Sequence, residues 1–269
     1  MSPLLLLLAL AAAEEPAAGE RLRQAAARGD VVSMRRELHA AQCMAAHRDD
    51  AARLASPLPP PCDAVLEAPD KRGRTALHLA AYEGRAPALE ALLAAGADVE
   101  RADAAGARAI HHAAIGGRSA ALRLLLARGA DANSRDADGV SALMSAAMNG
   151  YSESVALLAA AGADMNLPAR GGATALHVTA ADNLPGMVNQ LLALGADVDA
   201  RGTAHQWCGK TPLAMARGAE VLHLLRAAVM QREAPVKRTE DGALDLRDMG
   251  LPDLPPPPPD NLDDAHSDE

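Results

Sequence analysis

The sequence predicts an all-α solenoid built from stacked two-helix units. Gly96-Ala97-Asp98 returns as Gly-Ala-Asp at 129–131, 162–164 and 195–197, a spacing of 33 residues three times in succession. A fixed period of this length is typical of repeat proteins, in which each unit contacts only its neighbours. The composition agrees, because 49% of the 269 residues are hydrophobic although the chain has no Phe, one Trp and two Tyr. Alanine and leucine must therefore fill the core, and both favour closely packed helices.

Each unit carries the signals for two helices. In the unit that starts at Asp70, the first helix begins after Thr75, whose hydroxyl can accept a backbone N–H, and ends at Gly84, which permits a left-handed turn. The second helix ends at Gly96. The side chains expected to be buried are Leu77, Ala80 and Ala81 in the first helix and Leu89, Leu92 and Leu93 in the second.

The order Gly-x-Thr-x-Leu-His-x-Ala-Ala, then Leu-Leu, then Gly-Ala-Asp, over residues 73–98, resembles the ankyrin repeat. Further units follow at 103–135, 136–168 and 169–201, and the last ends near Val229, which makes about five repeats. The resemblance extends to an amino-terminal capping repeat, where polar Arg21, Arg23, Gln24 and Arg28 suit an exposed end. It implies a helix-turn-helix solenoid over residues 20–229 with short β-hairpin-like loops between repeats.

Some units depart from this pattern. Arg108 stands where Thr would cap the helix, so the second full unit is expected to lose roughly 1 kcal/mol of local support. Asn183 replaces the helix-ending Gly in the fourth unit, which a left-handed turn tolerates. Thr174 and Thr211 are 37 residues apart instead of 33, which indicates a shortened closing repeat after an insertion at 202–205.

A second insertion, at about residues 41–62, lengthens the first junction by 22 residues. His39, Cys43 and His47 recur every fourth residue there, and Cys62 would be a possible fourth ligand for tetrahedral zinc. Three ligands at i, i+4 and i+8 span about 12 Å of helix, so all three can hardly meet one ion. We therefore prefer a solvated helical face and predict no metal or cofactor. A disulfide between Cys43 and Cys62 is an intermediate possibility that requires an oxidising compartment.

The two ends of the chain lack the period. Residues 4–13 are uncharged and apolar, which is consistent either with a cleaved secretory signal or with a frayed helix leading into the first repeat. The compartment is secretory in the first case and cytoplasmic in the second. Residues 230–269 hold four basic and eleven acidic residues and a run of five prolines at 255–259, which predicts a disordered acidic tail.

The charge distribution bears on the class of partner. The net charge is −9, of which −7 falls in the tail, so residues 1–229 carry only −2. This balance argues against a nucleic-acid binder, which normally concentrates basic residues on one face. No segment is predicted to span a membrane in the mature chain. No hydrolase, kinase or phosphate-loop signature occurs, so we predict that the protein is not an enzyme.

His78, His111 and His177 occupy the same position of three repeats. A histidine triplet can indicate catalysis or metal binding, but equivalent positions lie one repeat apart along the array. The resemblance implies instead that these histidines bridge neighbouring repeats through hydrogen bonds.

The resemblance also implies that the hairpin loops and the last turn of each first helix face the concave side and bind protein partners. Tyr82 and Trp207 are possible contact anchors, because Trp, Tyr and Arg dominate binding hot spots. Trp207 could equally shield the end of the stack, and Tyr151 could pack against a loop. We predict a monomeric protein-binding module or scaffold that uses, besides neighbouring positions such as Ser145, the candidates Lys71, Arg72, Arg74, Tyr82, His112, Ile115, Asp138, Met148, Asn149, Trp207 and Met215.

Overall fold

The computed structural model describes residues 17–40, 62–204 and 207–233. The chain divides into two units, residues 1–229 and 230–269, and the repeats lie in the first. Residues 17–28 and 31–40 are helical. The later helices are α3 (Cys62–Leu66), α4 (Ala76–Glu83), α5 (Ala86–Ala94), α6 (Ala109–Ile115), α7 (Ser119–Ala127), α8 (Ala142–Met148), α9 (Ser152–Ala160), α10 (Ala175–Ala181), α11 (Pro185–Ala193), α12 (Pro212–Met215) and α13 (Ala219–Glu233).

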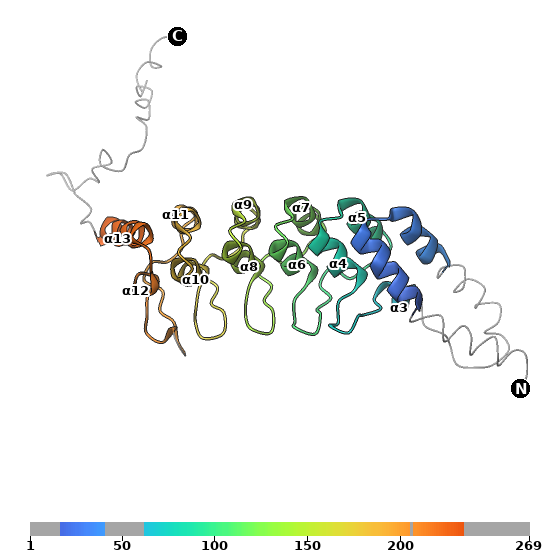
Figure 1. Cartoon of the computed structure of the whole chain (residues 1–269), viewed down its shortest axis with the longest axis horizontal. Helices are drawn as coiled ribbons and strands as arrows, with labels where there is room; N and C mark the ends of the chain where they lie inside the picture. The colour runs from blue at the N-terminus through green and yellow to red at the C-terminus, as the bar shows by residue number, and fades with distance from the viewer. Residues whose placement is uncertain (1–16, 41–61, 205–206, 234–269) are drawn as a thin grey trace, which may run out of the picture. The chain divides into compact units, whose positions relative to one another are not determined.

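The helices of the repeats form two rows. In four repeats the first helix packs against the second helix of its own repeat, as α4 does against α5 and α6 against α7. The first helices α4, α6, α8, α10 and α12 contact one another in sequence order, and α5, α7 and α9 form a parallel series. Figure 1 shows these rows, with the loops between repeats extending from the side of the first helices. The helix-turn-helix solenoid predicted from the 33-residue period is confirmed.

The core is aliphatic, as the composition predicts. Leu77, Ile110, Leu143 and Leu176 hold the same position in four repeats, and each is at most 2% exposed. The alanine that precedes each of them is also buried, which lets neighbouring helices approach closely. Every helix pair therefore buries its apolar face against the next pair.

The left-handed turns that end the first helices occur at the residues predicted from the sequence. Gly84 ends α4 with a φ of 72°, and Asn183 adopts a φ of 55° at the equivalent turn of the fourth repeat. Asn is one of the few residues other than Gly that tolerates this left-handed conformation. The prediction that Asn183 replaces Gly in its conformational role is confirmed.

Hydrogen bonds join the loops of neighbouring repeats on the side of the second helices. In four successive junctions a side-chain oxygen accepts a hydrogen bond from the backbone N–H of the Gly-Ala-Asp aspartate one repeat later, at 2.7–2.9 Å. The acceptors are Glu67, Glu100, Asn133 and Asn166, and the donors are Asp98, Asp131, Asp164 and Asp197. These bonds fix the position of each repeat relative to the next.

An aspartate shapes the hairpin loop of the first three full repeats. Asp70 Oδ1 accepts hydrogen bonds from the backbone N–H groups of Arg72 and Arg74, at 2.8 and 2.9 Å. Asp103 and Asp136 do the same in the next two repeats. The fourth repeat has Ala169 at this position, and its loop turns through Gly171 and Gly172, both with positive φ.

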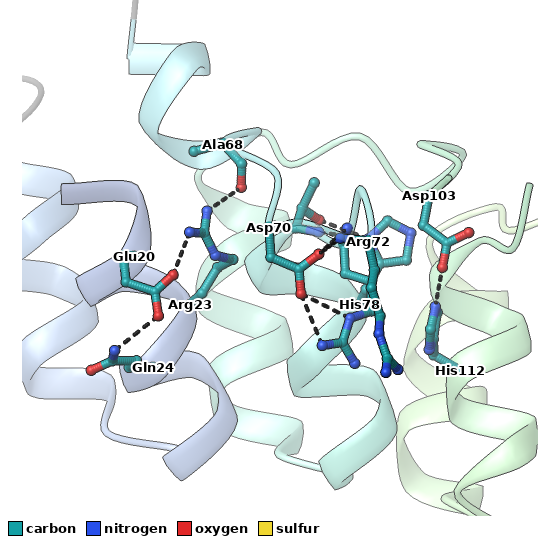
Figure 2. A network of polar contacts seen from close by, with 11 residues as sticks. Glu20, Arg23, Gln24, Ala68, Asp70, Arg72, His78, Asp103 and His112 are labelled. Carbon is teal, nitrogen blue, oxygen red and sulfur yellow. Dashed lines mark hydrogen bonds and ion pairs between the residues drawn. The ribbon is translucent and has the colours of Figure 1, made fainter. Parts of the chain in front are cut away.

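The amino-terminal repeat differs from the sequence prediction at Arg23. Arg21, Gln24 and Arg28 are exposed as expected, but Arg23 is buried. Its guanidinium donates to the Ala68 carbonyl at 2.7 Å and pairs with Glu20, as Figure 2 shows. Arg23 thus ties residues 17–28 to the chain that follows α3, and the expectation of an exposed side chain was wrong because the long-range acceptor was not visible in the sequence.

Two departures from the repeat pattern, at Arg108 and in the last repeat, are visible in the structure. Arg108 precedes α6 and cannot accept a hydrogen bond through its side chain; its Nε donates to the Glu100 carbonyl and lies 2.9 Å from the Glu100 carboxylate. In the last repeat α12 has four residues, whereas the other first helices have seven or eight. The first helix of the closing repeat is therefore shortened, in agreement with the spacing. α13 continues to Glu233.

Candidate functional site

Three large apolar side chains lie exposed in one column across the first helices. Tyr82 is 42% exposed, Ile115 38% and Met148 43%. Each is the seventh residue after the N-cap position of its helix, so the three are equivalent in the repeat. Because α4 packs on α6 and α6 on α8, the three side chains follow one another at the same position of neighbouring helices, and we call this row the apolar stripe. The fourth repeat continues it with the smaller Ala181.

The tips of the hairpin loops are joined to one another through the backbone. Ala104 donates its N–H to the Arg72 carbonyl at 3.0 Å, and Ala137 donates to the Ala105 carbonyl at 2.9 Å. Arg170 and Thr203 continue the series with bonds to Asp138 and Gly171. The loop tips therefore form an ordered edge, along which the predicted contact residues Lys71, Arg72 and Asp138 are all exposed.

The charged candidates differ in their availability to a partner. Arg74 is committed to Asp70, with Nη2 2.8 Å from Oδ2. Burial alone would raise the pKa of Asp70, but the hydrogen bonds from Arg74 and Arg72 lower it below its usual value. Asp138 lies 3.3 Å from Arg170 in an exposed pair. Lys71 and Arg72 have no ion pair among the residues that the structure describes.

His112 lies next to the apolar stripe and is also engaged within the protein. Its Nε2 lies 2.9 Å from Asp103 Oδ2, and the Asp103 side chain is only 6% exposed (Figure 2). The His112 and His78 rings meet edge to face, with centroids 5.1 Å apart. This histidine therefore stabilises the second hairpin loop, and its ring is less available for contact with a partner.

Trp207 packs between the fourth and the last repeat. Its ring meets His177 edge to face at 6.0 Å, and it lies so close to Gly202 that a Cβ on that glycine would be 2.4 Å from the Trp207 Cβ. The side chain is half-buried. This packing supports the alternative in which Trp207 shields the end of the stack.

The other predicted positions divide between surface and interior. Asn149 is exposed, and its Nδ2 donates to the Ser145 carbonyl at 2.8 Å. Met215 is half-buried. Ser145 is buried, so its inclusion among the contact positions was wrong. A Cβ on Gly117 would lie 2.7 Å from the Tyr151 ring, so Tyr151 packs over that loop, as the alternative interpretation held.

A cavity of about 310 Å³ lies between the hairpin loops of the fourth and last repeats. It is open to solvent on one side and is lined by Asn166, Pro168, Ala169, Gly171, Gly172, Thr174, Ala200, Arg201 and Thr203. No feature considered in the sequence analysis predicts this cavity, although Ala169 in place of the loop aspartate marks the junction as different.

Comparison with known proteins decides the family. The family described as "Ankyrin repeats (3 copies)" matches in four overlapping windows, residues 22–136, 77–169, 110–202 and 143–239. The chain belongs to the ankyrin repeat family.

Solved structures agree with this assignment. The chain is similar to the crystal structure of the ankyrin repeat domain of Bcl-3, described as a unique member of the IkappaB protein family, with 28% sequence identity and a TM-score of 0.57. The match covers 77% of this chain and 97% of that chain. A comparison with curated protein sequences gave no match. In the described residues, no helix has the length and apolar character needed to cross a bilayer.

The repeated histidines of this ankyrin array join neighbouring repeats. His78 Nδ1 accepts the Thr75 N–H at 3.0 Å, and His78 Nε2 lies 3.0 Å from the carbonyl of Arg101, in the loop that leads into the next repeat. A neutral imidazole that carries its proton on Nε2 satisfies both bonds. His111 and His177 repeat the arrangement with the carbonyls of Val140 and Lys210. The predicted bridging role is confirmed for His111 and His177, whose acceptors lie in the next repeat, whereas His78 bonds to the loop just before it.

Burial keeps the three histidines neutral. Desolvation is the largest cause of the lowered pKa in each, and for His78 the neighbouring His112 adds to it, which brings the pKa of His78 to about 4. Both ring nitrogens are occupied by backbone groups, so these imidazoles have no free position from which to exchange a proton with a substrate.

Of the four metal candidates, only the side chain of His39 lies within the residues that the structure describes. Cys43 and His47 lie outside the described residues, as do the side chain of Cys62, the apolar segment 1–13 and the tail from residue 234. His39 lies exposed in the helix at 31–40. Among the described residues no group of three His, Cys, Asp or Glu could hold a metal ion.

Proposed function

We propose that this ankyrin repeat protein is a non-enzymatic protein-binding module whose contact surface is the apolar stripe together with the hairpin tips beside it. The exposure of Tyr82, Ile115 and Met148 carries the proposal. Grouped apolar side chains on a soluble protein mark interaction sites, whereas single ones need no explanation. The three side chains belong to helices that are in contact with one another, so they are grouped rather than scattered.

The rigidity of the surface supports the same conclusion. Backbone bonds join the hairpin tips, the loop aspartates hold each hairpin in shape, and the buried histidines link consecutive repeats. A surface that is ordered before binding loses little conformational entropy on association. The partner, the compartment and the monomeric state remain predictions from the sequence.

The test is a triple variant, Tyr82→Ala, Ile115→Ala and Met148→Ala. All three side chains are more than a third exposed, so the variant is expected to keep the helical circular dichroism and melting temperature of the parent. Capture of partners from a cell extract, measured by quantitative mass spectrometry, should fall at least tenfold for any partner that uses this surface.

A matched control removes exposed apolar side chains elsewhere. Val32 is 71% exposed in the amino-terminal repeat and Leu194 is 39% exposed after α11, away from the hairpin tips. Val32→Ala with Leu194→Ala should leave capture unchanged. Equal capture by the parent and the triple variant would remove the apolar stripe as the binding surface.

A further inference from the structure

The side chains at the hairpin tips change in size along the array. The first tip carries the long and exposed Lys71 and Arg72. The second carries exposed Ala104 and Ala105, and the third begins with exposed Ala137. The tips are bonded to one another in this order, so the alanines leave a low section directly beside Lys71 and Arg72. A partner can approach the backbone most closely over this section.

Charge is distributed unevenly along the same edge. At the far side of the alanines, Asp138 and Arg170 neutralise each other in an ion pair. At the near side, Arg74 is neutralised by Asp70, whereas Lys71 and Arg72 have no acidic partner in the part of the chain that the structure describes. The first hairpin therefore presents excess positive charge next to an apolar centre. This is the arrangement of an interface with an apolar core and a charged rim.

The spacing of the apolar stripe restricts the conformation of a bound segment. Packed helices lie about 8–10 Å apart, so equivalent side chains on α4, α6 and α8 recur at about that distance. In an α-helix, residues seven apart lie on one face and about 10.5 Å apart along the axis, which is close to the spacing of the apolar stripe. In a β-strand, side chains on one face are about 6.6 or 13 Å apart, and neither distance matches.

A polyproline helix also has a suitable spacing, about 9.3 Å every third residue. Its recognition, however, depends on grooves lined by aromatic side chains. The stripe has one aromatic residue, Tyr82, beside an isoleucine and a methionine. Aliphatic and thioether side chains of this kind are suited to the apolar face of an amphipathic helix.

We propose that the occupant of this surface is an amphipathic helix of a partner protein, with apolar residues that recur every seven positions and acidic residues at the end that lies over Lys71 and Arg72. The inference rests on the proposed function and adds the chemical class and orientation of the partner. Its apolar residues cover Tyr82, Ile115 and Met148, and its backbone approaches the alanines of the second tip.

The experiment is a selection of 20-residue random peptides displayed on phage against the full-length chain. Synthetic copies of the enriched peptides are then measured by fluorescence anisotropy. We expect apolar residues at a spacing of seven, with Asp or Glu gathered at one end. Lys71→Glu with Arg72→Glu should weaken binding by about tenfold, whereas Arg128→Glu with Arg226→Glu, the same charge change at exposed positions elsewhere, should have less than a twofold effect.

Two peptide variants complete the test. A peptide whose acidic residues are replaced by lysine should bind the Lys71→Glu, Arg72→Glu variant more tightly than the parent protein. A proline in the middle of the peptide should abolish binding, because it interrupts the helix.

The outcomes separate this inference from the proposed function. Peptides that require the stripe, shown by loss of binding to a Met148→Arg variant, but that have no acidic end or that tolerate the central proline would overturn the helix proposal and leave the binding surface in place. Peptides that bind the Met148→Arg variant as well as the parent would overturn both.

Discussion

Lowering the pH from 7 to 5 is expected to destabilise the stack through the histidines that bridge neighbouring repeats. The pKa of His78 is about 4 in the folded protein, against an ordinary value of 6.5. Between these values the unfolded chain binds more protons than the folded one, so the free energy of unfolding decreases as the pH is lowered. The contribution of neutral His78 is complete above about pH 6.5 and is lost as the pH falls toward 4.

The magnitude follows from the same two values. Because the unfolded chain binds a proton at His78, the free energy of unfolding should be about 2 kcal/mol lower at pH 5 than at pH 7 from this residue alone. His111 and His177 act in the same direction. Asp70 and Asp103 have lowered pKa values, so their contributions are lost only as the pH falls below their ordinary value of 3.8, outside this interval.

The assay is urea unfolding, followed by circular dichroism at pH 7 and at pH 5, of the parent and of His78→Met. Methionine is the matched substitution because Met144 occupies the equivalent position of the third repeat. The variant loses the hydrogen bond to the Arg101 carbonyl, so it should be less stable at pH 7 by about 1 kcal/mol. Its loss of stability between pH 7 and pH 5 should be about 2 kcal/mol smaller than that of the parent.

A second variant controls for destabilisation itself. Ile110→Val removes a buried methylene at a cost of about 1 kcal/mol without removing a histidine, so its pH dependence should equal that of the parent. If His78→Met shows the same difference between pH 7 and pH 5 as Ile110→Val, the assignment of acid sensitivity to this histidine is refuted.

Three further substitutions test the repeat geometry, each by the midpoint of urea unfolding. Gly117→Ala should cost at least about 1 kcal/mol more than Gly150→Ala, because both glycines have positive φ but only Gly117 lies against the Tyr151 ring; equal costs would contradict this packing. Ser154→Ala should stabilise the protein by about 1 kcal/mol, since the buried Ser154 hydroxyl has no hydrogen-bond partner in the described structure; a loss of stability would show that the hydroxyl is bonded. Arg108→Thr should add up to about 1 kcal/mol by supplying a cap to α6, and no gain would mean that the contacts of Arg108 with Glu100 compensate fully.

Much of the fold could be predicted from the sequence because it depends on local and periodic signals. The 33-residue spacing, the caps and the helix-ending glycines act within one repeat, and the buried leucines recur at one position. The same periodicity placed Tyr82, Ile115 and Met148 on one surface. It could do so because a residue's number in the repeat determines the face on which it lies.

The positions that the sequence predicted wrongly or left open depend on contacts that its period does not determine. Arg23 is buried because it reaches the carbonyl of Ala68, 45 positions away. For Trp207 the sequence left two interpretations open, because it packs on His177 and Gly202 from the irregular closing loop, where the period no longer applies. The hydrogen bonds from the Gly-Ala-Asp aspartates to Glu and Asn side chains of the preceding repeat could have been inferred. An Asn or Glu recurs at residues 67, 100, 133 and 166 with the period of the array.

The central claim, that partners bind over the apolar stripe, is tested most directly by site-specific photo-crosslinking. A photoreactive amino acid is placed at Met148 in one sample and at Ala156, an exposed position of α9, in another. We predict that light-dependent adducts with a partner protein form from position 148 and not from position 156. Adducts that form only from position 156, or equally from both positions, would contradict the account.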